Sequence, residues 1–424
     1  MNIETLKLAI SEQREEIERE FREGNIITRE AQNIAGIDKT RQVLTITGVR
    51  RCGKSTLAHL LLRNRKYGYV NFDDERLEGM EAGELNSIVE AFYQLYGDVN
   101  FMIFDEIQNI PKWELFATRL QRSKRIIVTG SNSRLLSGEL ATRLTGRHVD
   151  ITLFPFSFRE FMDFRDLKYD IYLTRDIAKL KNSLKDYLVR GGFPEGDDKE
   201  HVRSVYSDII TKDILLRHGI RFRSTFKEFA RLAVSSFARE MTYSSMKNSL
   251  GIRSVHTARN YLEMLEEVFL VFRLPKFSFR PKEQIREPKK LYAVDNGIIS
   301  VLGMDSGKSM GRIFENNVFM ELKRRQSLHK NQELYYYKNT QGHEVDFVVR
   351  EGSTVRELIQ VCYSLEDEGT RNREIRSLMN ASRELGCKSL VVVTEDYEAE
   401  EEVSWFGLKR KIRFIPLWKW FLTG

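Results

Sequence analysis

Short, strongly apolar runs recur along the first 160 residues of the chain. Five of these runs have the length of β-strands, and they cover residues 43–47, 67–72, 101–105, 125–130 and 148–153. A strand that is apolar at nearly every position is typical of a parallel sheet with helices on both faces. Stretches of helical character, such as residues 11–22 and 56–63, precede or separate the runs. The pattern predicts an α/β domain built on a parallel sheet.

Helical periodicity dominates the next part of the chain. It extends over residues 177–189 and 202–217, and a glycine-rich turn at residues 191–194 separates the two stretches. We therefore predict an all-helical lid or linker over residues 161–220. No residues in this segment form a recognisable catalytic pattern.

Short helices and strands alternate in the segment that follows. Helical patterns cover residues 226–237, 243–250 and 255–267, and strand-like runs cover residues 268–274 and 291–294. Gly251 is a stop signal for the second helix, and Ser254 is placed to cap the third. This order predicts a winged helix-turn-helix, in which the basic loop at residues 279–290 is the wing.

The last part of the chain has an α-β-β-β-α-β pattern. The helices fall at residues 313–324 and 371–385, and the strands fall at residues 333–338, 344–349, 357–363 and 389–394. This order is that of the PD-(D/E)XK restriction-endonuclease fold. The whole chain is thus expected to be an α/β P-loop-type domain, a helical and winged-helix part, and an endonuclease-like α/β domain.

Composition agrees with a multidomain globular protein. The chain has 424 residues, of which 41% are hydrophobic and 30% charged, and this length suggests two to four domains. We place the boundaries at residues 1–160, 161–220, 221–305 and 306–424. No apolar run approaches the ~20 residues that span a bilayer, the N-terminus lacks a signal-peptide pattern, and the three cysteines lack metal-type spacing. We expect a cytoplasmic protein without membrane contact or a zinc site.

The first candidate for chemistry follows the first strand. The run is Gly48-Val49-Arg50-Arg51-Cys52-Gly53-Lys54-Ser55, followed by Thr56 at the start of a helix. It reads G-x-x-x-x-G-K-S between a strand and a helix, which is the phosphate-binding loop of P-loop nucleotidases. Backbone N–H groups of such a loop surround phosphate oxygens, and the helix N-terminus favours negative charge. We expect ATP here, with Lys54 on the β- and γ-phosphates and the Ser55 hydroxyl on Mg²⁺.

Two adjacent acids end the third strand. Asp105 is expected to hold Mg²⁺ through water, and Glu106 to polarise the water that attacks the γ-phosphate. The next strand along the chain ends in Ser131 and Asn132, either of which could reach the γ-phosphate or the water, because ligands bind beyond the carboxyl ends of parallel strands. A plain turn at these two residues is an equally good interpretation.

Two arginines precede the fifth strand. Arg143 and Arg147 are candidates for an arginine finger, which stabilises charge on the transferring phosphoryl group in cis or from a neighbouring subunit. Homo-oligomer formation is therefore an open alternative, as is a solvated basic turn without catalytic role.

The basic excess of the chain is concentrated in one segment. The formal net charge is +7, and residues 221–290 hold 15 Lys and Arg against seven Asp and Glu. Such an excess is the electrostatic footprint of a polyanion-binding surface. Five polar residues lie near the start of the predicted third helix, where a recognition helix contacts DNA: Arg253, His256, Thr257, Arg259 and Asn260. DNA is the expected partner, and a protein-interaction module is the alternative.

The endonuclease-like part departs from a working site. Such a site holds Mg²⁺ with an acid on the second strand and acid-x-Lys on the third. Asp346 fits the first acid, Glu315 could add a ligand from the helix, and Glu344 shares the strand face of Asp346. The third-strand positions are Gln360 and Cys362, which supply neither the second acid nor the lysine. We predict a degenerate domain that is a poor nuclease or none.

Taken together, these motifs resemble a known family. The matching stretches are residues 48–55, 71–75, 104–108, 129–132, 144–147, 154–158, 191–194, 314–316, 344–347 and 359–361. The chain resembles archaeal and bacterial AAA-type ATPases with a winged helix and a C-terminal endonuclease-like domain of unknown function. The resemblance implies ATP binding and an ATPase core with an additional strand between the strands that carry the two nucleotide-binding motifs. It implies no particular substrate.

The sequence therefore favours an Mg²⁺-dependent ATPase that couples its nucleotide state to DNA binding through a winged helix. Two alternatives stay open: a nucleotide-dependent switch that contacts only proteins, and an ATP-regulated nuclease.

Overall fold

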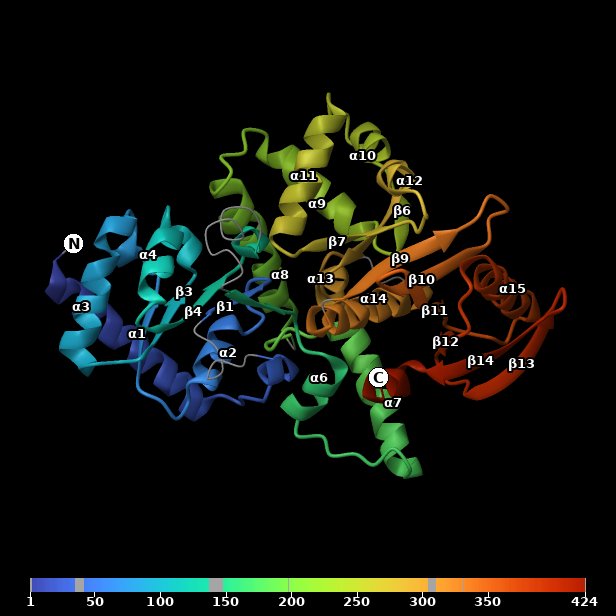
Figure 1. Cartoon of the computed structure of the whole chain (residues 1–424), viewed down its shortest axis with the longest axis horizontal. Helices are drawn as coiled ribbons and strands as arrows, with labels where there is room; N and C mark the ends of the chain where they lie inside the picture. The colour runs from blue at the N-terminus through green and yellow to red at the C-terminus, as the bar shows by residue number, and fades with distance from the viewer. Residues whose placement is uncertain are drawn as a thin grey trace. The chain divides into compact units, whose positions relative to one another are not determined.

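The computed structural model describes residues 2–34, 42–136, 148–196, 198–303, 310–329 and 331–423. Its internal contacts form two compact units (Figure 1). The first unit is Met1–Phe154 with residues 163–165 and 267–269, and the second is the remainder of the chain. Among the helices that the structure describes, none combines the length and the apolar character needed to cross a membrane.

The first unit is built on a five-stranded parallel sheet. Its strands are β1 (Val43–Gly48), β2 (Tyr67–Asn71), β3 (Phe101–Asp105), β4 (Arg125–Gly130) and β5 (His148–Leu153). They lie in the order β2-β3-β4-β1-β5, and all neighbours are parallel. Strand β4 therefore separates β1 from β3, as the family resemblance implied. The five strands and their parallel arrangement confirm the α/β prediction.

Amphipathic helices complete this unit. They are α1 (Ile3–Glu23), α2 (Lys54–Leu61), α3 (Leu85–Tyr96) and α4 (Trp113–Leu120). Apolar residues of α1, α3 and α4, among them Ile10, Phe92 and Phe116, share one core with Phe104 of β3. Helix α1 starts where the Asn2 side chain accepts a hydrogen bond from the Glu4 N–H at 3.1 Å, which is an N-cap.

Helices open the second unit, as predicted for residues 161–220. They are α6 (Phe158–Phe164), α7 (Thr174–Arg190), α8 (Lys199–Asp208) and a π-helical turn at Ile209–Leu216. Helix α7 ends at Gly191, which has φ = +78° and where a Cβ would lie 1.9 Å from Oδ1 of Asp295. The Asp295 carboxylate accepts hydrogen bonds from the N–H groups of Gly192 and Gly297, at 2.6 and 2.7 Å. Glycine is thus needed at this turn because the Asp295 carboxylate lies directly against the backbone.

Three helices and a small antiparallel sheet follow. The helices are α9 (Arg223–Ser235), α10 (Tyr243–Ser249) and α11 (Val255–Glu267), and the strands β6 (Arg239–Met241), β7 (Val271–Pro275) and β8 (Lys289–Ala293) lie in the order β6-β8-β7. Helix α11 begins and ends at the residues predicted for the third helix, 255 and 267. Ser254 Oγ accepts a hydrogen bond from the His256 N–H at 3.1 Å, so its capping role is confirmed.

The prediction of a continuous loop over residues 279–290 is wrong. Helix α12 (Pro281–Arg286) occupies half of it, and strand β8 already begins at Lys289. Pro281 fits the first turn of a helix, where its missing N–H costs nothing. Lys289 Nζ donates to the carbonyls of Gln284 and Ile285 at 2.5 and 3.2 Å, which satisfies the C-terminal end of the helix.

A six-stranded mixed sheet forms the rest of the second unit. Its strands are β9 (Gln332–Lys338), β10 (Glu344–Glu351), β11 (Thr354–Cys362), β12 (Leu390–Thr394), β13 (Ala399–Trp405) and β14 (Leu408–Pro416), in the order β13-β14-β12-β11-β10-β9. The helices are α13 (Asn296–Val301), α14 (Met310–Leu328), α15 (Glu368–Leu385) and α16 (Leu417–Thr423). The predicted α-β-β-β-α-β order is present, whereas the hairpin β13–β14 and helix α16 were not predicted.

Candidate functional site

The phosphate loop connects β1 to α2. Gly48 ends the strand, and a Cβ there would lie 2.0 Å from the Leu153 carbonyl oxygen, so no larger residue fits. Gly53 has φ = +93° and directly precedes Lys54, the first residue of α2. Val49 and Cys52 are buried between these glycines, and Arg51 is exposed with φ = 65°. The loop thus leads into a helix N-terminus, which favours anions.

The two predicted acids lie at the carboxyl end of β3. The Asp105 carboxylate accepts a hydrogen bond from the Tyr69 hydroxyl at 3.1 Å and another from the Thr129 hydroxyl. The Ser55 hydroxyl, at the start of α2, is also hydrogen-bonded to it. The structure therefore brings together Ser55 and Asp105, the two residues that the sequence assigned to Mg²⁺.

Glu106 follows with a left-handed backbone at φ = 50°. This conformation is uncommon for a residue other than glycine and turns the side chain away from the strand direction. Its carboxylate accepts hydrogen bonds from the Ser131 N–H at 3.1 Å and from the Gln108 amide. The Lys54 ammonium lies 3.4 Å from the same carboxylate. Glu106 is thus fixed between β4 and the phosphate loop.

The surroundings shift the pKa values of these two carboxyl groups in opposite directions. Burial, followed by the charge of Glu106, raises the pKa of Asp105. Burial by itself would also raise the pKa of Glu106, but the charges of Lys54 and Arg50 and the hydrogen bonds from Gln108 and Ser131 outweigh it and lower that pKa to about 2. Glu106 is therefore ionised at neutral pH, as a group that polarises water must be.

Cations surround the loop on several sides. The Lys54 ammonium donates a hydrogen bond to the Val49 carbonyl at 3.2 Å, and Arg50 forms an ion pair with Asp73 at 3.0 Å. Arg29 donates to the carbonyl of Cys52 at 2.9 Å and to that of Phe154 at 2.7 Å. The ammonium is suited to the phosphates of a nucleoside triphosphate, and the Ser55 hydroxyl and the buried carboxylates are suited to its Mg²⁺.

The remaining predicted residues have different outcomes. Thr56 lies in the first turn of α2, and Asn132 is buried directly after Ser131. Arg143 and Arg147 lie outside the described residues. Sequence reasoning gave no role to Thr129, Gln108 or Arg29, whose contacts organise the site. Gln108 and Thr129 carried a signal, since they lie two residues from Glu106 and from Ser131.

A second charged cluster lies in the second unit. The Lys290 ammonium, on β8, is within 2.9 Å of Glu315 and of Asp346 and within 2.7 Å of Glu344. The Tyr292 hydroxyl also donates to Glu315 at 2.7 Å. Lys290 is only 3% exposed. Burial lowers its pKa, but the carboxylates of Asp346 and Glu315 outweigh that effect and raise it well above the usual value.

This lysine fills the position between the acids that the sequence assigned to an endonuclease-like site. At the third-strand positions, the Gln360 amide donates to Glu374 at 2.7 Å, and the Cys362 thiol donates to the Ser364 carbonyl at 3.1 Å. Among the described residues, no group of three or more His, Cys, Asp or Glu is arranged to hold a metal ion. Lys290 was not foreseen, because it was placed in the wing.

Three family models match successive parts of the chain. The family model of an AAA domain matches residues 40–162. Two models described as domains of unknown function, DUF8612 and DUF4143, match residues 181–308 and 310–419.

Related proteins span nearly the whole chain. The uncharacterized protein MJ1544 of Methanocaldococcus jannaschii is 33% identical over 400 residues, which cover 90% of this chain and 88% of that protein. An uncharacterized protein of Haemophilus influenzae is 27% identical over 402 residues, which cover 89% of this chain and 95% of that protein.

Solved structures are more distant. The Aeropyrum pernix ORC1 protein in complex with DNA is 14% identical, with a TM-score of 0.33 and coverage of 65% of this chain and 90% of that one. A RuvB protein of Thermotoga maritima is 17% identical, with a TM-score of 0.30 and coverage of 57% and 87%. Likenesses this remote add nothing further about the chain.

Two substitutions separate nucleotide binding from turnover. Lys54→Ala should abolish tight ATP binding, because the phosphates lose their main cation. Glu106→Gln should keep binding and reduce turnover by about 10²–10⁴-fold, since loss of a positioned base has effects of that order. Calorimetric ATP binding and phosphate release measure the two properties. A Glu106→Gln protein that hydrolyses ATP at the wild-type rate would show that the water-activating acid is a different residue.

The Lys290 cluster should be sensitive to loss of its cation. Lys290→Ala leaves three carboxylates together without the ammonium, and we expect a loss of about 3–5 kcal/mol in the free energy of unfolding. Lys282→Ala, at an exposed lysine of α12, is the control and should stay within about 0.5 kcal/mol of the wild type. Urea unfolding measures both. Equal midpoints for the two variants would contradict a stabilising role of the buried ammonium.

Proposed function

The chain belongs to the family of AAA-domain proteins that includes MJ1544 of Methanocaldococcus jannaschii, and on that premise we propose that it binds and hydrolyses ATP and couples its nucleotide state to DNA binding. The observation that supports ATP hydrolysis best is the position of Glu106. It is a buried, ionised carboxylate 3.4 Å from the phosphate-loop lysine.

Each of the described site residues has its own role in the proposed hydrolysis. The loop from Gly48 to Ser55 holds the phosphates, and Lys54 exchanges its contact with Glu106 for the phosphate charge. Ser55 and Asp105 would hold Mg²⁺, which would neutralise charge on the phosphate oxygens. The Ser131 N–H and the Gln108 amide keep Glu106 oriented. Glu106 then accepts a hydrogen bond from water and raises its nucleophilicity.

The order of elements in the second unit supports a DNA-binding role. The elements follow the order α9-β6-α10-α11-β7-α12-β8, with a three-stranded antiparallel sheet. Apart from the short helix α12 between β7 and β8, this order is typical of a winged helix. Arg253, His256 and Arg259 are exposed at the start of α11, the helix that would enter the major groove.

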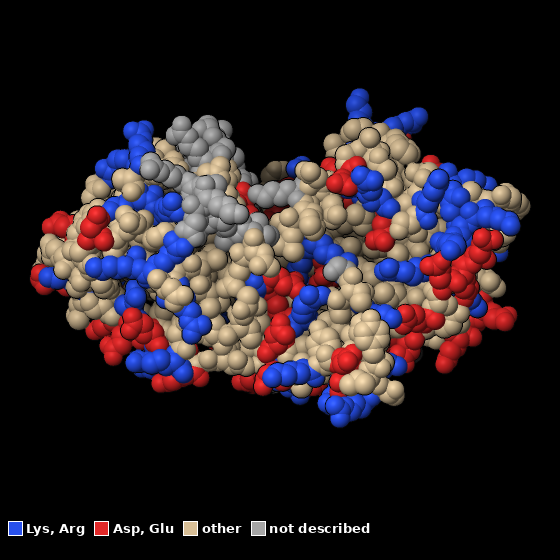
Figure 2. Space-filling model, turned by 60° about the horizontal axis from the view of Figure 1, so that its bottom comes forward, with Lys and Arg blue, Asp and Glu red and all other residues tan. Residues whose placement is uncertain are grey.

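Part of the basic excess in residues 221–290 is engaged within the protein. Arg273 forms an ion pair with Glu266, Lys276 pairs with Glu287 at 3.1 Å, and Lys290 is buried. Arg259 also contacts Glu263 at 2.8 Å, one helical turn away. Figure 2 shows basic and acidic side chains interspersed over the face it presents. The DNA contact is therefore expected to depend on a few arginines rather than on the total charge.

Exposed apolar residues favour a protein partner as the second candidate. Phe279 lies just before α12 and is 75% exposed, and Ile285 lies in α12 and is 78% exposed. Large apolar side chains at the tip of a wing suit a protein surface better than phosphates. In this alternative the nucleotide state controls contacts with a protein.

Substitution of the recognition-helix arginines distinguishes the two candidates. Arg253→Ala with Arg259→Ala should weaken DNA binding and leave ATP binding unchanged. Each lost phosphate contact should flatten the dependence of log affinity on log salt by about 0.9. Fluorescence anisotropy at several salt concentrations, with ATP turnover measured with and without duplex DNA, gives both quantities. Unchanged DNA affinity and salt slope would favour the protein partner, and Phe279→Ser with Ile285→Ser is the matching variant for that case.

Nuclease activity should be absent. The acids that would hold a metal are paired with Lys290, and a positively charged ammonium excludes a divalent cation from the same place. Incubation of the wild type with plasmid, linear and branched DNA and with Mg²⁺ or Mn²⁺ should leave the DNA intact. Cleavage by the wild type that disappears in Asp346→Ala would overturn this expectation and support the ATP-regulated nuclease.

A further inference from the structure

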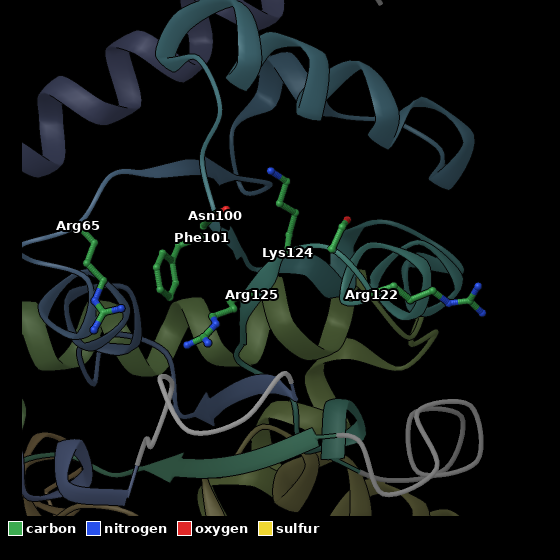
Figure 3. A pocket seen from close by; sticks show the side chains of 7 residues that line it. Arg65, Asn100, Phe101, Arg122, Lys124 and Arg125 are labelled. Atoms are coloured by element: carbon green, nitrogen blue, oxygen red, sulfur yellow. The ribbon is translucent and has the colours of Figure 1, made fainter.

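A basic pocket lies at the amino-terminal edge of the parallel sheet in the first unit. It has a volume of about 450 Å³ and is lined by Arg65, Asn100, Phe101, Arg122, Ser123, Lys124 and Arg125 (Figure 3). These residues come from the loop that precedes β2 and from the starts of β3 and β4. The phosphate loop and the two acids are at the opposite, carboxyl-terminal edge.

Two short loops concentrate the charge there. Residues 63–66 read Arg-Asn-Arg-Lys, and residues 122–125 read Arg-Ser-Lys-Arg, so each loop has three cations in four positions. Both loops follow helix C-termini, where one or two cations are expected from the helix dipole. Six cations on these two loops exceed that requirement, and four of them line the pocket: Arg65, Arg122, Lys124 and Arg125. None of the described residues that line the pocket is acidic.

The centre of the pocket is an aromatic ring bracketed by arginines. The guanidinium of Arg65 lies 4.7 Å from the Phe101 ring centroid, and that of Arg125 lies 5.7 Å from it. Figure 3 shows these two side chains on either side of the ring. Such contacts hold the flexible arginines close together and limit the entropy lost when they bind a ligand.

The floor of the pocket is fixed by other contacts. The Arg125 N–H donates to the Asn100 carbonyl at 2.9 Å. Lys124 forms an ion pair with Asp98 at 2.5 Å and lies 5.1 Å from the Tyr93 ring centroid. These contacts hold Lys124 in place, and the guanidinium groups of the lining come from Arg65, Arg122 and Arg125.

We propose that this pocket binds the backbone phosphates of a nucleic-acid strand. Guanidinium groups recognise phosphate by paired hydrogen bonds, and the Asn100 amide beside them can donate to a sugar or phosphate oxygen. A free nucleotide triphosphate suits the pocket less well. The lining consists of long side chains, whereas the phosphate loop of the same unit offers backbone N–H groups at a helix N-terminus. The inference extends the proposed DNA binding to the ATPase unit.

Three elements connect the pocket to the nucleotide site. Helix α2 begins at Lys54 and ends four residues before Arg65, β3 runs from Phe101 to Asp105, and β4 runs from Arg125 towards Thr129. The strands have five or six residues, so the two edges are about 15–20 Å apart. A strand held at the amino edge thus contacts the same elements that position the nucleotide-binding residues.

Charge reversal tests the pocket in the full-length protein. The variant is Arg65→Glu with Arg125→Glu, and the matched control is Arg19→Glu with Arg22→Glu on the exposed face of α1. Affinity for a fluorescent single-stranded 30-mer is measured by anisotropy at several salt concentrations, with inorganic tripolyphosphate as a separate ligand. We expect the pocket variant to lose roughly tenfold in affinity and its salt slope to flatten by about 0.7 per lost contact. The control should bind like the wild type.

Photo-crosslinking of the same oligonucleotide locates the bound strand. Crosslinked peptides that contain residues 63–66, 100–101 or 122–125 would support the pocket, even if the Arg253→Ala and Arg259→Ala protein binds normally and the winged-helix proposal fails. Crosslinks confined to residues 221–290, with equal affinities for pocket variant and control, would overturn the pocket and leave the winged helix in place. Binding of tripolyphosphate that the pocket variant loses, without binding of the oligonucleotide, would also overturn it.

Discussion

Burial of two neighbouring carboxylates, Asp105 and Glu106, is the constraint that organises the first unit. Moving an ionised group out of water costs several kcal/mol, so each buried acid must find a cation or hydrogen-bond donors. Lys54 and Arg50 of the loop supply the positive charge. Tyr69, Thr129 and the Ser131 N–H supply hydrogen bonds from the two strands that flank β3. The loop, β2 and β4 are thereby held to one point at the end of the sheet.

Much of this site could be predicted because its determinants are local in sequence. The loop from Gly48 to Ser55 is a continuous motif, and the acid pair directly follows an apolar strand. The order β2-β3-β4-β1-β5 does not follow from periodicity. The family resemblance implied only one part of it, the additional strand between β1 and β3. The contacts of Thr129 and Arg29 depend on how distant segments pair, which hydrophobic patterns do not encode.

Lys290 shows the opposite case. A run of basic residues next to proline and glutamate is typical of an exposed loop, and the strand-like pattern that follows begins only at residue 291, so the sequence places Lys290 in the loop. Pairing of β8 with β6 and β7 carries it inward. The acids that meet it come from α14 and β10, which are 25 to 56 residues further along the chain. Only the tertiary arrangement reveals that these acids share an ion pair with one buried lysine.

Buried carboxylates are paired with a lysine at both sites, Lys54 in the first unit and Lys290 in the second, but the consequences differ. Lys54 belongs to a loop, contacts one carboxylate at 3.4 Å and keeps a second contact with a backbone carbonyl, so phosphate oxygens can replace both partners. Lys290 lies within a strand and contacts three carboxylates at 2.7 to 2.9 Å. Displacing it would leave those acids buried together without a cation. An exchangeable cation permits ligand binding, whereas a fixed one stabilises the fold, and this difference favours the Lys54 cluster over the Lys290 cluster as a ligand-binding site.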